Sequence, residues 1–102
     1  MSPSIDQHRA ELSDLCRRYR VLSLSLFGSA VRDDFDPERS DYDFLVEFEA
    51  LPSGHYADAY FGLLEALQQL LGRPVELVVA SAIKNPYFRQ SVEQTKALLY
   101  AA

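Results

Sequence analysis

The chain has 102 residues, of which 48% are hydrophobic and 25% are charged. This length and balance are typical of a globular protein with one packed core, so we expect residues 1–102 to form a single domain. The 15 acidic residues outnumber the 10 basic ones, and the formal net charge is −5. Such acidity argues against a protein that binds long nucleic acid through its phosphates.

Three features of the sequence indicate a cytoplasmic protein. The single cysteine, Cys16, cannot form an intrachain disulfide, which fits a reducing compartment. The start of the chain has no apolar core of signal-peptide length. The longest mostly apolar run, residues 21–31, contains three serines and a glycine and is too short to cross a membrane. We therefore expect a cytoplasmic protein with no membrane association.

Residues 4–19 predict a helix, and residues 21–27 predict a strand. Apolar side chains recur at helical spacing in the first segment. In the second segment Leu22, Leu24 and Leu26 alternate with serines, and this period of two is typical of a strand. The expected inward face of the helix consists of Ile5, Leu12, Leu15, Cys16 and Tyr19.

A polar segment and a second strand follow. Residues 32–40 are charged and contain a proline, which predicts a short helical turn and then a loop. Residues 42–48 alternate again, with Asp41 and Asp43 on one face and aromatic and apolar side chains on the other. The link between the two strands is too short for a parallel crossover, so we expect them to be antiparallel neighbours in a mixed sheet.

The second half of the chain predicts a helix, a strand and a helix. Residues 56–71 form an amphipathic pattern, and Gly72 is the expected helix end. Residues 75–79 are nearly all apolar and predict a third strand. Asn85 followed by proline predicts a helix start, and we expect this helix to run to about residue 99. Its expected inward residues are Phe88, Val92, Leu98 and Leu99. The complete order, αβ(α)βαβα, indicates an α/β domain with a small mixed sheet flanked by helices.

Gly28 and Ser29 lie directly after the first predicted strand. A glycine allows close backbone approach and unusual dihedral angles. A serine hydroxyl and the free N–H groups of the following turn can together bind a phosphate. A glycine-serine pair is common, however, and an ordinary strand-ending turn is the alternative interpretation.

Three carboxylates form the second candidate group. Asp41 and Asp43 are two residues apart on a strand and project together, so they repel each other unless a cation lies between them. Oxygen ligands suit magnesium, which also binds substrate phosphates. Glu76 lies in an otherwise apolar segment, residues 74–79, where an unpaired buried carboxylate is costly. Either its strand is at a sheet edge or it faces metal ions. Ordinary solvated surface carboxylates are the alternative for all three.

The motif LFGSAVRDDFDPERSDYDFLVEF, residues 26–48, resembles the signature of the polymerase-beta-like nucleotidyltransferases. The chain is most similar to their minimal nucleotidyltransferase (MNT) branch, and the order of helices and strands also fits. Two positions differ from the family pattern. Eleven residues separate Ser29 from Asp41, one more than in the family, and the third carboxylate is a glutamate where an aspartate is more common.

The resemblance implies a role for each candidate residue. The glycine-serine pair matches the family's triphosphate-binding pair, and a nearby arginine could contact phosphate. The two aspartates match the metal ligands, and the glutamate lies where the family has its third carboxylate. The implied nucleotide-binding residues are Gly28, Ser29 and Arg32, and the implied catalytic and metal-binding residues are Asp41, Asp43 and Glu76. Two magnesium ions are the implied cofactors.

The implied reaction is transfer of a nucleoside monophosphate, with ATP as the favoured donor, to an acceptor hydroxyl. Resemblance to the MNT antitoxins further implies a HEPN-domain toxin as partner and acceptor, through a tyrosine. Two alternatives stay open. The chain could be a non-catalytic antitoxin that masks a HEPN partner, or a transferase with a small-molecule acceptor. Relatives of the last kind have an additional helical domain for which 102 residues leave no room. The base and the oligomeric state are not determined by the sequence.

Overall fold

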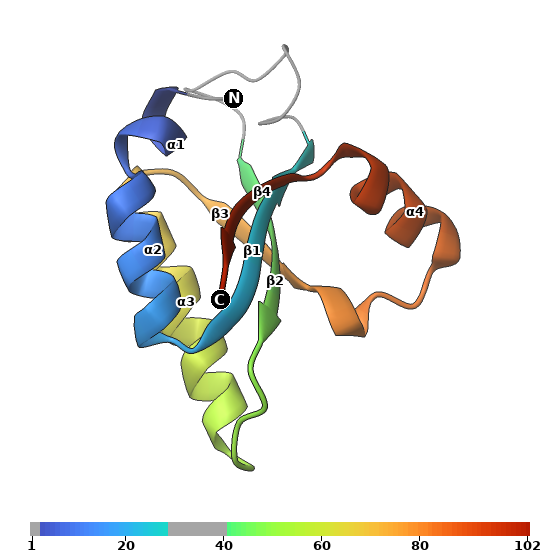
Figure 1. The fold of residues 1–102 in the computed structure, drawn as a ribbon, viewed down its shortest axis with the longest axis horizontal. Helices are drawn as coiled ribbons and strands as arrows, with labels where there is room; N and C mark the ends of the chain where they lie inside the picture. The colour runs from blue at the N-terminus through green and yellow to red at the C-terminus, as the bar shows by residue number, and fades with distance from the viewer. Residues whose placement is uncertain (1–2, 29–40) are drawn as a thin grey trace.

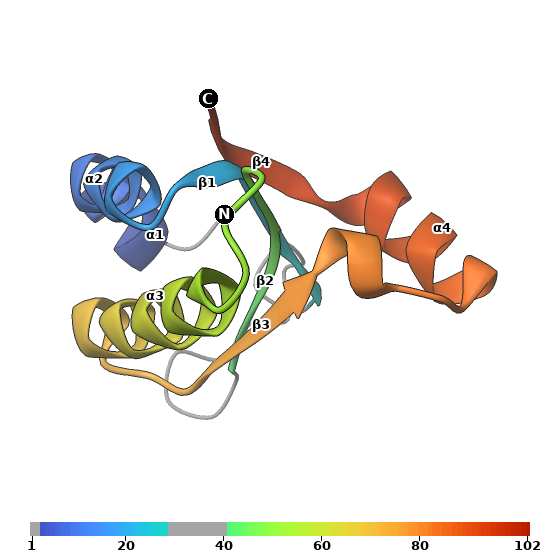
Figure 2. The same cartoon turned by 90° about the horizontal axis from the view of Figure 1, so that it is seen from below.

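The structure, a computed structural model, describes residues 3–28 and 41–102. Within these ranges, four strands form one mixed sheet with helices on both faces (Figures 1 and 2). The α/β class expected from the sequence is therefore confirmed. The expected helical turn and loop at 32–40 lie outside the described residues. So do Ser29 and Arg32.

The sheet has the strand order β3-β2-β1-β4. The central strand β1 (Val21–Phe27) pairs antiparallel with β2 (Tyr42–Phe48) on one side and with β4 (Ala97–Ala101) on the other. On the outer side of β2, β3 (Val75–Val79) runs parallel to it. The first three strands have the bounds that the sequence predicts, and the antiparallel pairing of the first two is confirmed.

Three helices cover one face of the sheet: α1 (Pro3–Gln7), α2 (Arg9–Arg18) and α3 (His55–Leu71). Figure 2 shows them on one side of the strands, with α4 (Pro86–Thr95) on the other side. The larger core lies between the three helices and the sheet. Its fully buried members include Ile5, Leu12, Cys16, Leu24, Leu26, Tyr42, Phe44, Val46, Leu63 and Leu67.

The α3 helix provides the crossover that parallel pairing of β2 and β3 requires. It ends at Gly72, as the sequence predicts, in the left-handed conformation with φ 66°. The Gly72 amide donates to the Gln68 carbonyl over 2.9 Å, so one of the last carbonyls of the helix is satisfied.

The first predicted helix is divided in two, so the prediction of one helix over 4–19 is wrong in this detail. At His8 the backbone has φ −109° and ψ 18°, and the His8 amide bonds to the Ile5 carbonyl, three residues back, over 3.1 Å. A tighter turn of this kind interrupts the α-helical ladder. The expected inward face is largely retained, because Leu15 and Tyr19 still pack on the larger core.

Leu22 does not share a face with Leu24 and Leu26, contrary to the predicted alternation. The pairing of β1 with β2 shifts register between Val21 and Ser23, as in a β-bulge. The bulge turns the Leu22 side chain outward, where it is 47% exposed, and Val21 is buried instead.

The expected helix over 85–99 ends early and is followed by a strand that the sequence analysis missed. It begins as predicted at Asn85, whose side chain caps it, but α4 stops at Thr95. Lys96 has an extended conformation, φ −65° and ψ 147°, and β4 then pairs with the free edge of β1. As a result, Leu98 is 58% exposed and not inward.

The second face of the sheet has a smaller core beneath α4. It consists of Phe27, Leu45, Ile83 and Val92. Phe88, which was expected to be inward, is 41% exposed, and it contacts the edge of Phe27 with ring centroids 6.1 Å apart. Within the described ranges, no helix combines the length and apolar character needed to cross a bilayer.

Candidate functional site

Asp43 and Glu76 lie side by side on the face of the sheet that also bears α4. They are register partners in the parallel pairing of β2 and β3, and partners in adjacent parallel strands, about 4.8 Å apart, point to the same face. Phe27 is the antiparallel partner of Asp43. The three residues therefore form one row across the sheet, which we call the carboxylate row. The sequence predicts each acid, but their adjacency depends on the register.

Gly28 follows the buried end of this row and lies against Asp43. Its φ of 73° is in the left-handed region. A Cβ atom at position 28 would overlap the Oδ2 atom of Asp43 and lie 3.3 Å from its Cγ atom. Both the conformation and the space beside the carboxylate therefore require glycine. The unusual dihedral angle that the sequence allows at Gly28 is therefore observed, and the backbone closely approaches the Asp43 carboxylate. The expected approach to a phosphate stays a prediction.

The carboxylates differ in exposure. Asp43 is half-buried, whereas Asp41, just before the start of β2, and Glu76 are exposed. Glu76 lies on β3, an edge strand of the sheet, so its charge stays solvated inside an apolar segment. Of the two explanations offered by the sequence for Glu76, the edge position is confirmed. That Glu76 faces metal ions stays a prediction, and its register partner is another acid, Asp43.

The residues fit a magnesium site that a nucleotide completes. Within 3–28 and 41–102, no three His, Cys, Asp or Glu side chains are grouped closely enough to hold a metal by themselves. Magnesium commonly takes only one or two carboxylates, with substrate phosphates and water as its other ligands. Asp43 and Glu76 offer such a pair, and glycine at position 28 leaves open the space beside Asp43.

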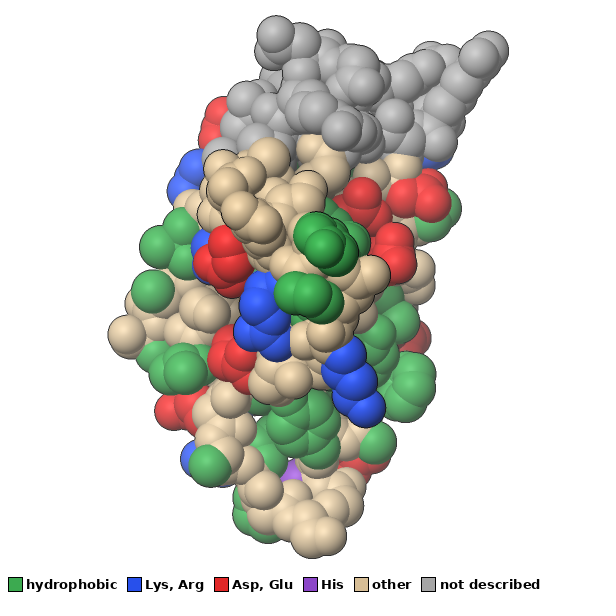
Figure 3. All heavy atoms as spheres, turned by 90° about the vertical axis from the view of Figure 1, so that its right-hand side faces the viewer, with side chains coloured by type: hydrophobic (Ala, Val, Ile, Leu, Met, Phe, Trp, Pro, Cys, Tyr) green, Lys and Arg blue, Asp and Glu red, His purple; other side chains and the backbone are tan. Residues whose placement is uncertain are grey.

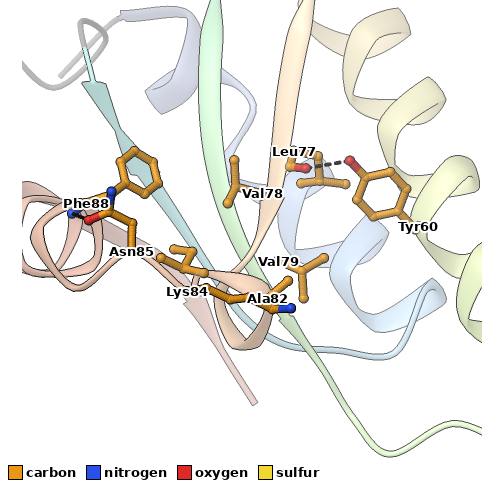
Figure 4. A pocket seen from close by; sticks show the side chains of 9 residues that line it. Tyr60, Leu77, Val78, Val79, Ala82, Lys84, Asn85 and Phe88 are labelled. Carbon is orange, nitrogen blue, oxygen red and sulfur yellow. Dashed lines mark hydrogen bonds between the residues drawn. The ribbon is translucent and has the colours of Figure 1, made fainter.

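Two cavities lie near the carboxylate row, one at its Phe27 end and one along β3. A cavity of about 210 Å³ opens beside Gly28 and is lined by Phe27, Phe88, Ser91, Val92 and Thr95. A larger one, of about 590 Å³, lies along β3 and the segment that follows it (Figure 4). Neither cavity is predicted by the sequence, because each is formed by elements that are distant in the chain. Phe88, which lines both cavities, was expected in the core.

The single cysteine has no place in this site. Cys16 is fully buried in the larger core, on the opposite face of the sheet. Burial raises the pKa of its thiol to about 12, although the nearby Arg17 opposes this shift. A thiol with such a pKa is not a nucleophile near neutral pH.

Comparisons with known proteins agree with the motif. Residues 8–99 match the model of a family described as "Nucleotidyltransferase domain". The chain is 40% identical over 93 residues to "Putative protein adenylyltransferase MJ0128" of Methanocaldococcus jannaschii, which covers 83% of this chain and 91% of the relative. It is also 40% identical over 78 residues to "Protein adenylyltransferase MntA" of Thermococcus cleftensis, and this match covers 76% of this chain and 72% of the relative.

Solved structures agree with the fold. One described as a "putative minimal nucleotidyltransferase" matches with a TM-score of 0.76 at 30% identity and covers 92% of this chain and 91% of that chain. Another match is a chain from a complex of a tri-AMPylated Shewanella oneidensis HEPN toxin with an MNT antitoxin. Its TM-score is 0.65 at 19% identity, and the match covers 95% of this chain and 72% of that chain. These matches confirm the fold that the motif implies.

Proposed function

This chain belongs to the nucleotidyltransferase domain family, and we propose that it transfers AMP from ATP to a hydroxyl group of an acceptor protein. The observation that best supports this proposal is the carboxylate row with Gly28 beside it. An acidic pair next to a glycine in the left-handed conformation provides a metal-binding group and a close backbone approach in one place. Ser29 and Arg32 complete the proposed nucleotide-binding residues.

In the proposed reaction the acceptor oxygen forms a bond to the α-phosphorus of ATP. The bond from this phosphorus to the bridging oxygen breaks, and pyrophosphate leaves. Magnesium, when bound, offsets the charge of the phosphates. Asp41, Asp43 and Glu76 would hold it. Glu76, the exposed member of the carboxylate row, also accepts the proton of the acceptor hydroxyl. Gly28 and Ser29 orient the outer phosphates, so position and charge supply most of the rate.

The proposed acceptor is a tyrosine of a HEPN-domain toxin, with this chain as the antitoxin. The relatives named protein adenylyltransferases support a protein acceptor. The complex of an AMPylated HEPN toxin with an MNT antitoxin supports the partner class. We also propose that residues 1–102 act as one domain in the cytoplasm, where ATP is available. Masking without catalysis and a small-molecule acceptor are the competing functions.

The metal-dependent part of this proposal is tested by nucleotide binding. We expect the protein to bind ATP at least tenfold more tightly with magnesium than with excess chelator. Asp43→Asn should remove this difference without unfolding the domain, because Asn lacks the charge that attracts the ion. Glu47→Gln is the matched control, since Glu47 is a half-buried acid on the same face of β2. Equal binding with and without magnesium in the wild-type protein would contradict the site.

A further inference from the structure

The larger cavity, which we call the edge groove, has a distinct chemical character. Its walls are mostly apolar and include Val78, Val79, Ile83 and Phe88, with Tyr60 at one end. In Figure 4 the side chains of Tyr60 and Phe88 lie at opposite ends of the groove and Val78 between them. A concave apolar surface of this size, with few polar groups, is typical of a binding site.

Two polar side chains of the edge groove, Asn85 and Lys84, offer hydrogen-bond donors to an occupant. The Oδ1 atom of Asn85 accepts from the amides of Tyr87 and Phe88, over 2.9 and 3.2 Å, so its NH₂ group is the part left to bind an occupant. Lys84 is exposed and forms no ion pair with any described residue. Tyr60 donates its proton to the Leu77 carbonyl over 2.5 Å. The groove thus favours an occupant with negative charge next to an apolar group.

Such a preference contrasts with the acidity of the chain as a whole, whose net charge is −5. Figure 3, a view from the side of α4, shows basic and hydrophobic side chains near the middle of this face and acidic side chains on both sides of them. An acidic segment would be attracted at Lys84, because the lining of the groove contains no carboxylate.

The edge groove is continuous with the carboxylate row. Val78, which lines the groove, follows Glu76 by two residues on the same strand, so both side chains point to the same face about 6.6 Å apart. A bound segment could therefore place one residue at Glu76 and a neighbouring residue in the groove. The small cavity beside Gly28 lies at the other end of the row, against Phe27, and Gly28 is one of the proposed nucleotide-binding residues.

Strand addition to β3 does not explain the groove. The outward carbonyl of Leu77 already accepts from Tyr60, and the amide of Val75 donates to the Gln68 side chain over 3.3 Å. An added strand would have to displace the Val75–Gln68 bond and share the Leu77 carbonyl with Tyr60. Recognition through side chains leaves them intact.

We propose that the edge groove binds the segment of the acceptor protein that surrounds the modified hydroxyl. This segment has an aromatic or aliphatic side chain that fills the groove and, within a few residues of the hydroxyl, an aspartate or glutamate that pairs with Lys84. The inference rests on the proposed function for the identity of the hydroxyl. The groove itself is testable without any transfer.

The test uses two synthetic 11-residue peptides, each with a central tyrosine next to a phenylalanine. One has glutamates on both sides of this pair, and the other has lysines in their place. Each is titrated into ¹⁵N-labelled protein without nucleotide. We expect the acidic peptide to shift the amide signals of Val78, Ile83 and Lys84, and to bind at least fivefold more tightly than the basic one. Lys84→Glu should remove this preference.

Arg18→Glu is the matched control for Lys84→Glu. Arg18 is an exposed residue of α2, on the opposite face of the sheet, and forms no ion pair with a described residue. It changes the net charge equally, so peptide binding should stay within twofold of wild type. No binding of the acidic peptide, or equal loss in both variants, would overturn the proposal. So would competition by magnesium with a non-hydrolysable ATP analogue, because the groove would then hold the base.

Adding magnesium and ATP to the acidic peptide separates the two proposals. If the peptide binds in the groove but gains no AMP, the proposed transfer to a protein hydroxyl is contradicted and the proposed binding role of the groove is not. If Lys84→Glu leaves AMP transfer unchanged, the binding role of the groove is contradicted and the transferase function is not.

Discussion

Position 28 combines two constraints that can be separated by mutation. Gly28 and Gly54 both have positive φ, 73° and 89°. A Cβ atom at Gly28 would meet the Asp43 carboxylate, whereas one at Gly54 would have nothing within 4 Å. Gly28 is therefore required both by its backbone conformation and by the closeness of the Asp43 carboxylate. Gly54 is required by its backbone conformation alone.

We expect Gly28→Ala to weaken magnesium-dependent ATP binding at least tenfold, because the methyl group displaces the Asp43 carboxylate. Backbone strain should also lower the free energy of unfolding by about 1 kcal/mol. In Gly54→Ala the strain remains but the contact is absent, so stability should fall while ATP affinity is unchanged. Calorimetric titration and urea unfolding of both variants measure the two effects. Wild-type ATP affinity in Gly28→Ala would show that the Gly28–Asp43 contact has no role in binding.

Glu76→Gln tests whether the exposed acid of the carboxylate row takes part in transfer. General base catalysis contributes roughly 10²–10⁴-fold, so AMP transfer should fall at least 100-fold. Stability should be unchanged or slightly higher, because Gln removes a charge beside Asp43. Glu47→Gln should retain transfer. Full transfer activity in Glu76→Gln would make Glu76 an ordinary edge-strand residue.

At the residue level, the sequence predicts the acids of the site but not their arrangement. The Asp-x-Asp spacing places Asp41 and Asp43 on one face of a strand, because side chains alternate. The pairing of Asp43 with Glu76 depends on the register of two strands that are separated by α3, and no local pattern specifies that register. Lys84 has no sequence signal of its own, because its importance comes from the cavity around it.

Among the elements, local signals were sufficient for three strands and not for the fourth. The strands β1, β2 and β3 have alternating or continuous apolar patterns bounded by turn residues. In β4, Leu98 and Leu99 follow Val92 at a spacing that also fits a helix. Pairing with β1, more than 70 residues earlier in the chain, stabilises the extended form. Long-range pairing thus overrides a local helical pattern.

The α4 helix depends on its N-cap for much of its stability, since Val92 is its one fully buried residue. We expect Asn85→Ala to lower the free energy of unfolding by about 1 kcal/mol, because two amides of the first turn lose their acceptor. Asn85→Asp keeps an acceptor oxygen and should retain most of the stability. Urea unfolding midpoints compare the variants. Equal stability of the Ala variant and wild type would mean that tertiary contacts alone hold the helix.

The whole molecule divides its tasks between the two faces of one sheet. The face beneath α1, α2 and α3 contains the larger core and the buried cysteine. The other face has a smaller core under α4, and it also bears Asp43 and Glu76, with one cavity at the Phe27 end of their row and another along β3. Substitutions of Asp43 and Glu76, the two acids of the carboxylate row, can therefore change chemistry without removing the packing that stabilises the fold.

Because the acids of the site lie apart from the larger core, variants of these acids can distinguish AMP transfer to the partner from inhibition of the partner by binding alone. We expect a HEPN partner, mixed with the wild-type protein, magnesium and ATP, to gain whole AMP units by mass spectrometry. The double variant Asp41→Asn with Asp43→Asn should fold normally but add none, and it should fail to neutralise the partner in cells at matched expression. A second double variant, Glu47→Gln with Glu49→Gln, removes the same charge from the same strand and its end and should behave as wild type. If the aspartate variant still neutralised the partner and wild type added no mass, the chain would act by binding alone, as an antitoxin on a nucleotidyltransferase scaffold.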